Sequence, residues 1–176
     1  MFGLSKMEKG SEVIKMEEIQ YGVANEGDLL SLTTFLEEPV IDNAFIKPLS
    51  QRPTSIKERV NKKFKEGCWI LARHEGKIIG CLALIPSKNE EVEISTFAVS
   101  PMVRGRGIGS KLISQAEKET PKRFKDCKTL VLDSWEGNPA ISKLMQKHGF
   151  EFRTSFPDPD KRPAGISTVV YDKPVR

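Results

Sequence analysis

The sequence predicts an α/β domain in which helices pack around one central sheet. Two hydrophobic patterns lead to this prediction: short apolar runs, and longer stretches with apolar residues at every third or fourth position. These patterns alternate along the chain and are separated by glycine, proline and asparagine. The chain has 176 residues, of which 38% are hydrophobic and 30% charged. This length and composition suit one globular domain and are too small for two packed domains with a linker.

The first 18 residues are predicted to form a loosely ordered N-terminal arm. They are rich in charge, and their apolar residues follow no clean period. From residue 19 onward the pattern becomes regular. We therefore expect a single domain over residues 19–176.

Two helices are predicted early in this domain. Asn25 can cap the first helix, because Asp28 follows three residues later. Ser55 and Glu58 have the spacing of a capping box at the start of the second helix. In the run Lys62-Lys63-Phe64-Lys65, we assign the phenylalanine to the core side and the lysines to solvent. This run is interpreted as a solvated face and not as a nucleic-acid site.

A meander of three strands follows over residues 68–73, 77–86 and 91–99. The third strand is predicted to alternate between two faces without interruption. One face then carries Val92, Ile94, Thr96 and Ala98, and the other carries Glu93, Ser95, Phe97 and Val99.

The rest of the chain mixes helices and strands. An amphipathic helix begins at Ile108 and is predicted to stop at Pro121. A buried strand follows at residues 129–132, and Asn138-Pro139 is a strong signal for the start of the next helix. The chain is expected to close with strands at residues 150–154 and 166–171.

Charge and composition exclude several classes of protein. The net charge of +4 is too small an excess to indicate a nucleic-acid binder, which carries a concentrated basic face. It is compatible with a small anion bound at one site. The longest nearly apolar run, residues 78–86, is far shorter than the roughly 20 residues that cross a membrane. Three cysteines without a CxxC pair and two isolated histidines give no metal-ligand spacing. We expect a cytoplasmic protein with reduced cysteines and no metal.

The clearest chemistry lies where the third meander strand meets the next helix, in the run Arg104-Gly105-Arg106-Gly107-Ile108-Gly109. The first turn of a helix has backbone N–H groups without internal partners, and glycines let an anion approach them. Ser110 breaks the Rossmann spacing, and Lys111-Leu112 breaks the Walker A spacing. The remaining alternative is an ordinary glycine-rich turn with two solvated arginines.

The run Val99-x-Pro101-x-x-Arg104-Gly105-x-Gly107-Ile108-Gly109 resembles motif A of the GNAT superfamily of N-acetyltransferases, whose core is Q/R-x-x-G-x-G/A. Asn138-Pro139-Ala140 and Gly149-Phe150 are similar to the second motif of that family. The predicted order of elements also resembles the family over residues 19–171. The resemblance implies a mixed, mostly antiparallel sheet of about seven strands. This sheet would be splayed between its fourth and fifth strands and flanked by helices on both faces.

The resemblance further implies that acetyl-CoA is the co-substrate and an amine the acceptor. Backbone amides of residues 104–110 would hold the pyrophosphate, and the preceding strand would hydrogen-bond the pantetheine arm. Ser142, one turn after Asn138, could also bind a relaying water. The implied cofactor-binding residues are Phe97, Ala98, Val99, Arg104, Gly105, Arg106, Gly107, Ile108, Gly109, Ser110, Asn138 and Ser142.

Glu93 is the candidate catalytic base, because many family members carry a glutamate at this place. The alternative is that Glu93 is merely a polar position of a half-exposed strand. Many relatives also have a tyrosine acid four residues before the glycine of the second motif, where this chain has Met145. We therefore name no general acid. By resemblance, the acceptor should enter over residues 43–59 and 156–165.

The sequence leaves three functions open. The leading prediction is an N-acetyltransferase that acts on an amine-bearing small molecule or peptide by direct attack in a ternary complex. A CoA-binding regulatory module of the same fold is the alternative, and a nucleic-acid-binding domain that uses the lysine clusters is the third. For the leading prediction we expect no nucleic-acid or membrane partner, and a monomer or homodimer.

Overall fold

The computed structural model describes residues 18–42 and 44–175. The predicted arm therefore lies outside the described residues, apart from Glu18. The strands are β1 (Gln20–Val23), β2 (Cys68–His74), β3 (Lys77–Pro86), β4 (Glu91–Val99), β5 (Thr129–Trp135), β6 (Glu151–Pro157) and β7 (Ser167–Pro174). The helices are α1 (Leu29–Glu37), α2 (Pro39–Asp42), α3 (Ile56–Glu66), α4 (Ile108–Arg123) and α5 (Pro139–Lys147). Short 3-10 turns lie at Glu26–Asp28, Leu49–Gln51 and Pro101–Val103.

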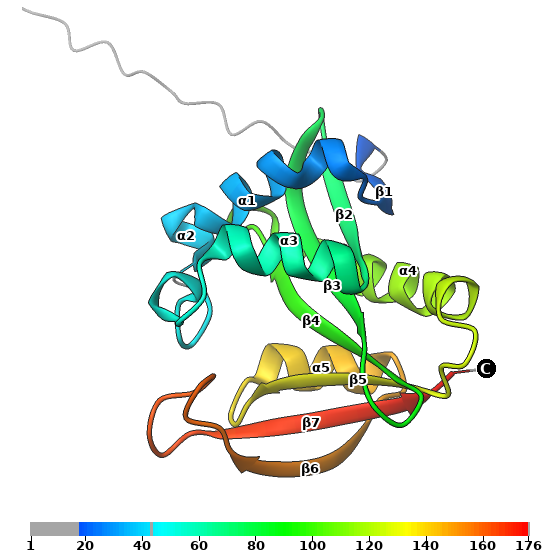
Figure 1. Ribbon diagram of the computed structural model, residues 1–176. Coiled ribbons are helices and arrows are strands. Elements are labelled where there is room, and N and C mark those ends of the chain that lie inside the picture. Colours follow the sequence, from blue (N-terminus) through cyan, green and yellow to red (C-terminus); the bar gives the residue numbers. More distant parts are fainter. Residues whose placement is uncertain (1–17, 43, 176) are drawn as a thin grey trace, which may run out of the picture.

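The seven strands form one mixed sheet in the order β1-β2-β3-β4-β5-β7-β6. Only the β4–β5 pair is parallel among these neighbours. That pair is bonded from Glu91 opposite Thr129 to Ile94 opposite Leu132. Beyond this point both strands continue but no longer pair, so they diverge (Figure 1). The predicted fold class, including the splay between the fourth and fifth strands, is confirmed.

Two hydrophobic cores cover the two faces of the sheet. On one face, α1, α2 and α3 pack over β2 and β3 around Leu32, Val60 and the fully buried Trp69. On the other face, α4 and α5 contribute Leu112, Met145 and their neighbours. Figure 1 shows α3 and α4 on opposite sides of the central strands. In the part of the chain that the structure describes, no helix is both long and apolar enough to cross a membrane.

The local helix signals are confirmed where side chains cap the backbone. Ser55 and Glu58 form the capping box of α3, and Asn138 accepts a hydrogen bond at the start of α5. Asn25 and Asp28 also form a capping box, but it caps the 3-10 turn that leads into α1 and not α1 itself. The prediction that Pro121 stops its helix is wrong, because α4 continues to Arg123. A proline this close to the end of a helix removes only one of the last intrahelical hydrogen bonds.

The predicted uninterrupted alternation of β4 is also wrong. Between the pairs Ser95–Ala83 and Ala98–Cys81, β4 has one more residue than β3, so β4 carries a bulge. Thr96 lies in this bulge with a positive φ of 47°. Val92 and Ile94 consequently share the core of α4 with Phe97, while Ala98 belongs to the opposite core. The extra residue moves every later side chain of the strand to the other face.

Candidate active site

The first part of the site is a cavity of about 550 Å³ at the N-terminus of α4, which we call the glycine-loop cavity. Ten of the twelve predicted cofactor-binding residues line it: Phe97, Ala98, Val99, Arg104, Gly105, Gly107, Ile108, Gly109, Ser110 and Asn138. Arg106 and Ser142 do not line it. The bulge places Phe97 on the α4 side, so the ring can form a wall of this cavity.

The glycine loop owes its shape to two positive φ angles. Gly105 has a φ of 77° and Gly107 a φ of 80°, and Gly107 is the N-cap of α4. Side-chain-bearing residues rarely adopt this conformation. No side chain caps α4, so its first N–H groups are left without the usual capping partner. A Cβ added at Gly109 would lie 3.2 Å from Phe97 Cζ, which shows how closely the helix approaches β4.

Two polar side chains that line the cavity, one at the start of α5 and one in the first turn of α4, already have partners in the chain. Asn138 Oδ1 accepts from the backbone N–H of Ile141, and its Nδ2 donates to Ser134 Oγ at 3.1 Å. Ser110 Oγ lies 2.8 Å from His148 Nε2. Asn138 therefore acts first as the cap of α5, and any contact with a ligand would come in addition to that role.

The second part of the site is a cavity of about 370 Å³, which we call the cationic cavity. Its walls come from α3, β4 and β5, from residues 45–54 before α3, and from the loop after β6. Glu93 lines this cavity, as do Lys161 and Arg162. The two segments expected at the acceptor entrance, 43–59 and 156–165, therefore both reach it, although residue 43 lies outside the described residues.

Glu93 does not share a face with Phe97 and Val99, in contrast to the sequence-based prediction. Glu93 precedes the bulge and faces the cationic cavity, whereas Val99 follows the bulge and lines only the glycine-loop cavity. Phe97 lies at the border of the two cavities, with Phe45, Trp135 and Ile141. The bulge thus directs side chains of one strand toward two adjoining cavities.

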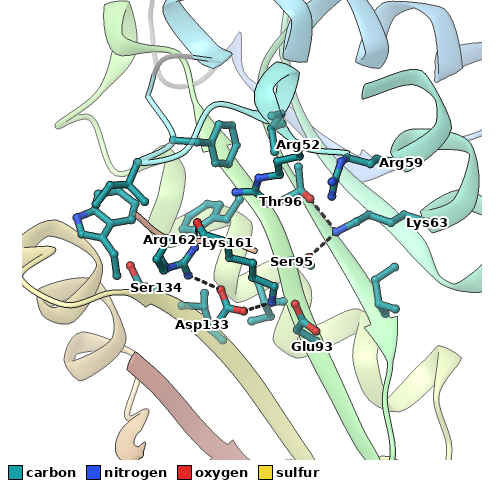
Figure 2. Close-up of a pocket in the computed structure, with 18 of the residues that line it drawn as sticks. Arg52, Arg59, Lys63, Glu93, Ser95, Thr96, Asp133, Ser134, Lys161 and Arg162 are labelled. Atoms are coloured by element: carbon teal, nitrogen blue, oxygen red, sulfur yellow. Dashed lines mark hydrogen bonds and ion pairs between the residues drawn. The ribbon is translucent and has the colours of Figure 1, made fainter. Parts of the chain in front are cut away.

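A cluster of charged side chains surrounds Asp133 in the cationic cavity (Figure 2). Lys161 Nζ lies 2.5 Å and Arg162 Nη2 lies 2.9 Å from its carboxylate oxygens. Burial acts to raise the pKa of Asp133, but these two cations together hold the pKa below its usual value. Asp133 is therefore the shared ion-pair partner of the two cations in the loop after β6, and its single charge offsets one of their two.

Lys63 reaches the same cavity from α3. Its Nζ donates hydrogen bonds to the hydroxyls of Ser95 and Thr96, the latter at 2.8 Å. Burial lowers the pKa of Lys63 to about 8, against the opposing effect of the nearby Glu93 carboxylate. The interpretation of this lysine as part of a solvated face is wrong. Lys63 follows Ile56 by seven residues and Val60 by three, which are helical spacings that place it on the buried face.

The other cations of the cavity left no comparable signal in the sequence. Arg52 lies outside any helix or strand, and Arg162 lies in the loop between β6 and β7. The predicted strand ends at residue 132 and so does not include Asp133, whereas β5 continues to Trp135. Among the described residues, no group of three or more His, Cys, Asp or Glu side chains is arranged to hold a metal ion.

Known sequences similar to this chain include acetyltransferases. A model of the acetyltransferase (GNAT) family matches residues 35–150. A UPF0039 protein of Schizosaccharomyces pombe is 36% identical over 72 residues, which are 41% of this chain and 48% of that protein. The spermine/spermidine N(1)-acetyltransferase of Bacillus subtilis is 28% identical over 86 residues, which are 45% of this chain and 56% of that enzyme. The matched region therefore spans about half the length of these curated relatives.

Solved structures of acetyltransferases share this fold. The structure of yncA from Salmonella typhimurium, solved with its cofactor acetyl-CoA, superimposes with a TM-score of 0.69 at 18% identity. That superposition covers 90% of this chain and 95% of the other. The family model covers more than half of the chain, and its match includes the glycine loop and the start of α5. The chain belongs to the GNAT family of acetyltransferases.

Proposed function

We propose that this acetyltransferase moves the acetyl group of acetyl-CoA to the primary amine of a small molecule or peptide, by direct attack in a ternary complex. One observation carries the proposal: the glycine-loop cavity and the cationic cavity adjoin at four shared wall residues, Phe45, Phe97, Trp135 and Ile141. An acyl donor in the first cavity and an amine in the second would meet at this border.

The glycine-loop cavity suits the acyl donor. The N-terminus of α4 presents backbone N–H groups and a partial positive charge, which favour a pyrophosphate. Beyond Ile94, β4 no longer pairs with β5, so its edge can bond the amides of a pantetheine arm as an added strand. We assign Arg104 to Ser110 and Phe97 to Val99 to these two tasks, with Arg106 and Ser142 receiving the least support because neither lines the cavity.

Glu93 is proposed as the general base. An alkyl amine titrates near pH 10, so at neutral pH it is mostly protonated and not nucleophilic. The Glu93 carboxylate lines the cavity assigned to the acceptor and can take this proton directly or through a water. The amine nitrogen then bonds to the acetyl carbon, the C–S bond of the thioester breaks, and the thiolate of CoA leaves. A thiol titrates near 8.5, so the thiolate can leave without a protein acid.

The cysteines support direct attack over an acyl-cysteine intermediate. Burial raises the pKa of all three thiols, and it raises that of Cys81 to about 12. A thiol with a raised pKa is a poor nucleophile, because the thiolate is the reactive form. Met145, at the place where many relatives carry a tyrosine, is buried in the core and supplies no proton.

The test combines binding and turnover. We expect acetyl-CoA to raise the melting temperature of the chain, and a panel of primary amines to release CoA thiol in proportion to acetylated product. Stabilisation without transfer to any amine would instead identify a CoA-binding module. A lack of stabilisation would contradict the proposal. The cytoplasmic location, and the choice between monomer and homodimer, remain predictions from the sequence.

A further inference from the structure

The geometry points to an acceptor that carries an anionic group, a carboxylate or a phosphate, in addition to its amine. Arg52, Arg59 and Lys63 would bind this anion in the cationic cavity. This inference rests on the proposed function, because it assigns the acceptor of the same reaction. It narrows the acceptor to small, amino-acid-like molecules and disfavours amines whose only charges are positive.

The charges that line the cavity do not balance. The basic lining residues are Arg52, Arg59, Lys62, Lys63, Lys161 and Arg162, and the acidic ones are Glu66, Glu93 and Asp133. Asp133 pairs with Lys161 and Arg162, and Lys62 pairs with Glu66 at the exposed rim. Among the described residues, Arg52, Arg59 and Lys63 form no ion pair with a carboxylate.

Arg52 is the cavity cation that most clearly lacks a hydrogen-bond acceptor. Its Nε is buried and has no hydrogen-bond partner among the described residues, and its Nη2 makes only a long bond of 3.4 Å to the carbonyl of Lys47. Burial and the neighbouring cations Arg59 and Arg162 lower the pKa of this guanidinium, against the opposing effect of two more weakly acting carboxylates. A buried donor without a partner is costly to fold, and two neighbouring cations add to that cost. A bound oxyanion would satisfy the donor and offset the repulsion.

The cavity holds the groups that would bind the two charged ends of such an acceptor on opposite sides. Figure 2 shows Arg52 and Arg59 on one side of the cavity and Glu93 on the opposite side. An amine directed toward Glu93 would leave the anionic end of the same molecule near the two arginines. The volume of about 370 Å³ lies at the small end of the range for ligand pockets, which suits an acceptor of amino-acid size.

The same charges oppose a polyamine. Spermine and spermidine, the substrates in the name of the Bacillus subtilis relative, are polycations. Their second and third ammonium groups would face Arg52, Arg59 and Lys63. Like charges brought together in a partly desolvated site repel each other, so this chain should have a different acceptor preference.

The experiment compares acceptors that differ only in the anionic group. We would measure kcat/KM at saturating acetyl-CoA for β-alanine against β-alaninamide, and for phosphoethanolamine against ethanolamine, with spermidine as the polycation. The expected result is a preference of about tenfold or more for the anionic member of at least one pair. Arg52→Gln and Arg59→Gln should each remove most of this preference. Lys57→Gln, an exposed charge change on α3 outside the cavity, should leave it intact.

The two pairs distinguish the two sources of the anion. Preference only for β-alanine identifies a carboxylate, and preference only for phosphoethanolamine identifies a phosphate. Equal kcat/KM within both pairs, or a preference for spermidine, would overturn the inference while leaving the acetyltransferase proposal intact.

A binding measurement covers the case in which none of these amines is acetylated. Glutarate and inorganic phosphate should raise the melting temperature of the CoA-bound chain, and Arg52→Gln should reduce that shift. If neither anion stabilises the chain, or Arg52→Gln leaves the shift unchanged, the inference is wrong. Failure of acetyl-CoA itself to bind would count against the proposed function.

Discussion

Lys63 Nζ donates a hydrogen bond to Thr96 Oγ1 at 2.8 Å, and this contact joins α3 to the bulge of β4. Thr96 has a φ of 47°, which is unfavourable for a β-branched residue. The bulge is also the feature that directs Glu93 and Val99 into different cavities. The lysine therefore supports the strained residue on which the geometry of the site depends.

Lys63→Met should change how stability depends on pH. The pKa of Lys63 falls from 10.5 to about 8 in the folded chain, so the unfolded chain binds more protons between these two values. The free energy of unfolding of the wild type should therefore rise between pH 8 and 10.5, by up to about 3 kcal/mol from this group. Chemical denaturation of the wild type and of Lys63→Met at pH 7.5 and pH 10 measures this rise in the free energy of unfolding. If the variant shows the same rise, the lowered pKa is wrong.

Glu93→Gln should reduce turnover and leave acetyl-CoA binding nearly unchanged. Loss of a general base typically lowers kcat by about 100-fold or more, and the neutral amide cannot accept the proton. Raising the pH should partly restore the rate, because more of the amine is then deprotonated. Glu91→Gln is the matched control, since Glu91 lies on the same strand, pairs with Arg153 and lines neither cavity. An unchanged pH–rate profile in Glu93→Gln would exclude this residue as the base.

Gly107→Ala should weaken acetyl-CoA binding beyond its effect on stability. Gly107 has a φ of 80°, so an alanine there is strained by about 1 kcal/mol or more, and the loop must shift to relieve the strain. Gly76→Ala is the control, because Gly76 has a φ of 76°, equally open space, and a place in the β2–β3 turn. Both variants should lose similar stability in thermal melts. Equal acetyl-CoA affinity in titrations of the two would show that the loop does not bind it.

Asp133→Asn should destabilise the chain at neutral pH and much less in acid. The wild-type carboxylate, with its lowered pKa, stabilises the fold above its unfolded value of 3.8 and loses this effect as the pH falls through its folded value. Removing the charge also leaves the buried Arg162 without its partner, and breaking such a pair costs about 3 kcal/mol. Denaturation should show a constant difference between the two chains from pH 7 down to about pH 4, and a shrinking difference as the pH falls below 3.8 toward the lowered pKa. A difference that does not shrink below pH 3.8 would contradict the assigned pairing.

The sequence by itself determined the features that depend on neighbouring residues. The caps at Asn25, Ser55 and Asn138 form between residues two or three positions apart, so their spacing is visible in the chain. The glycine loop is equally local, because a positive φ at Gly105 and Gly107 needs only the absence of a Cβ. The period of the apolar residues predicted the order of the elements. The resemblance of two short motifs, at residues 99–109 and 138–150, indicated the family.

Only the tertiary structure decided the cationic cavity. The bulge at Thr96 arises from pairing with β3, so a strand pattern with perfect alternation could not reveal it. Arg52, Asp133 and Arg162 come from segments far apart in the sequence, and none of them follows a local rule that identifies a site. The helical spacing of Lys63 indicates only which face of α3 it occupies. Their charges matter because folding brings them together and removes water. A charge acquires a strong interaction only with the neighbours and burial that the fold supplies.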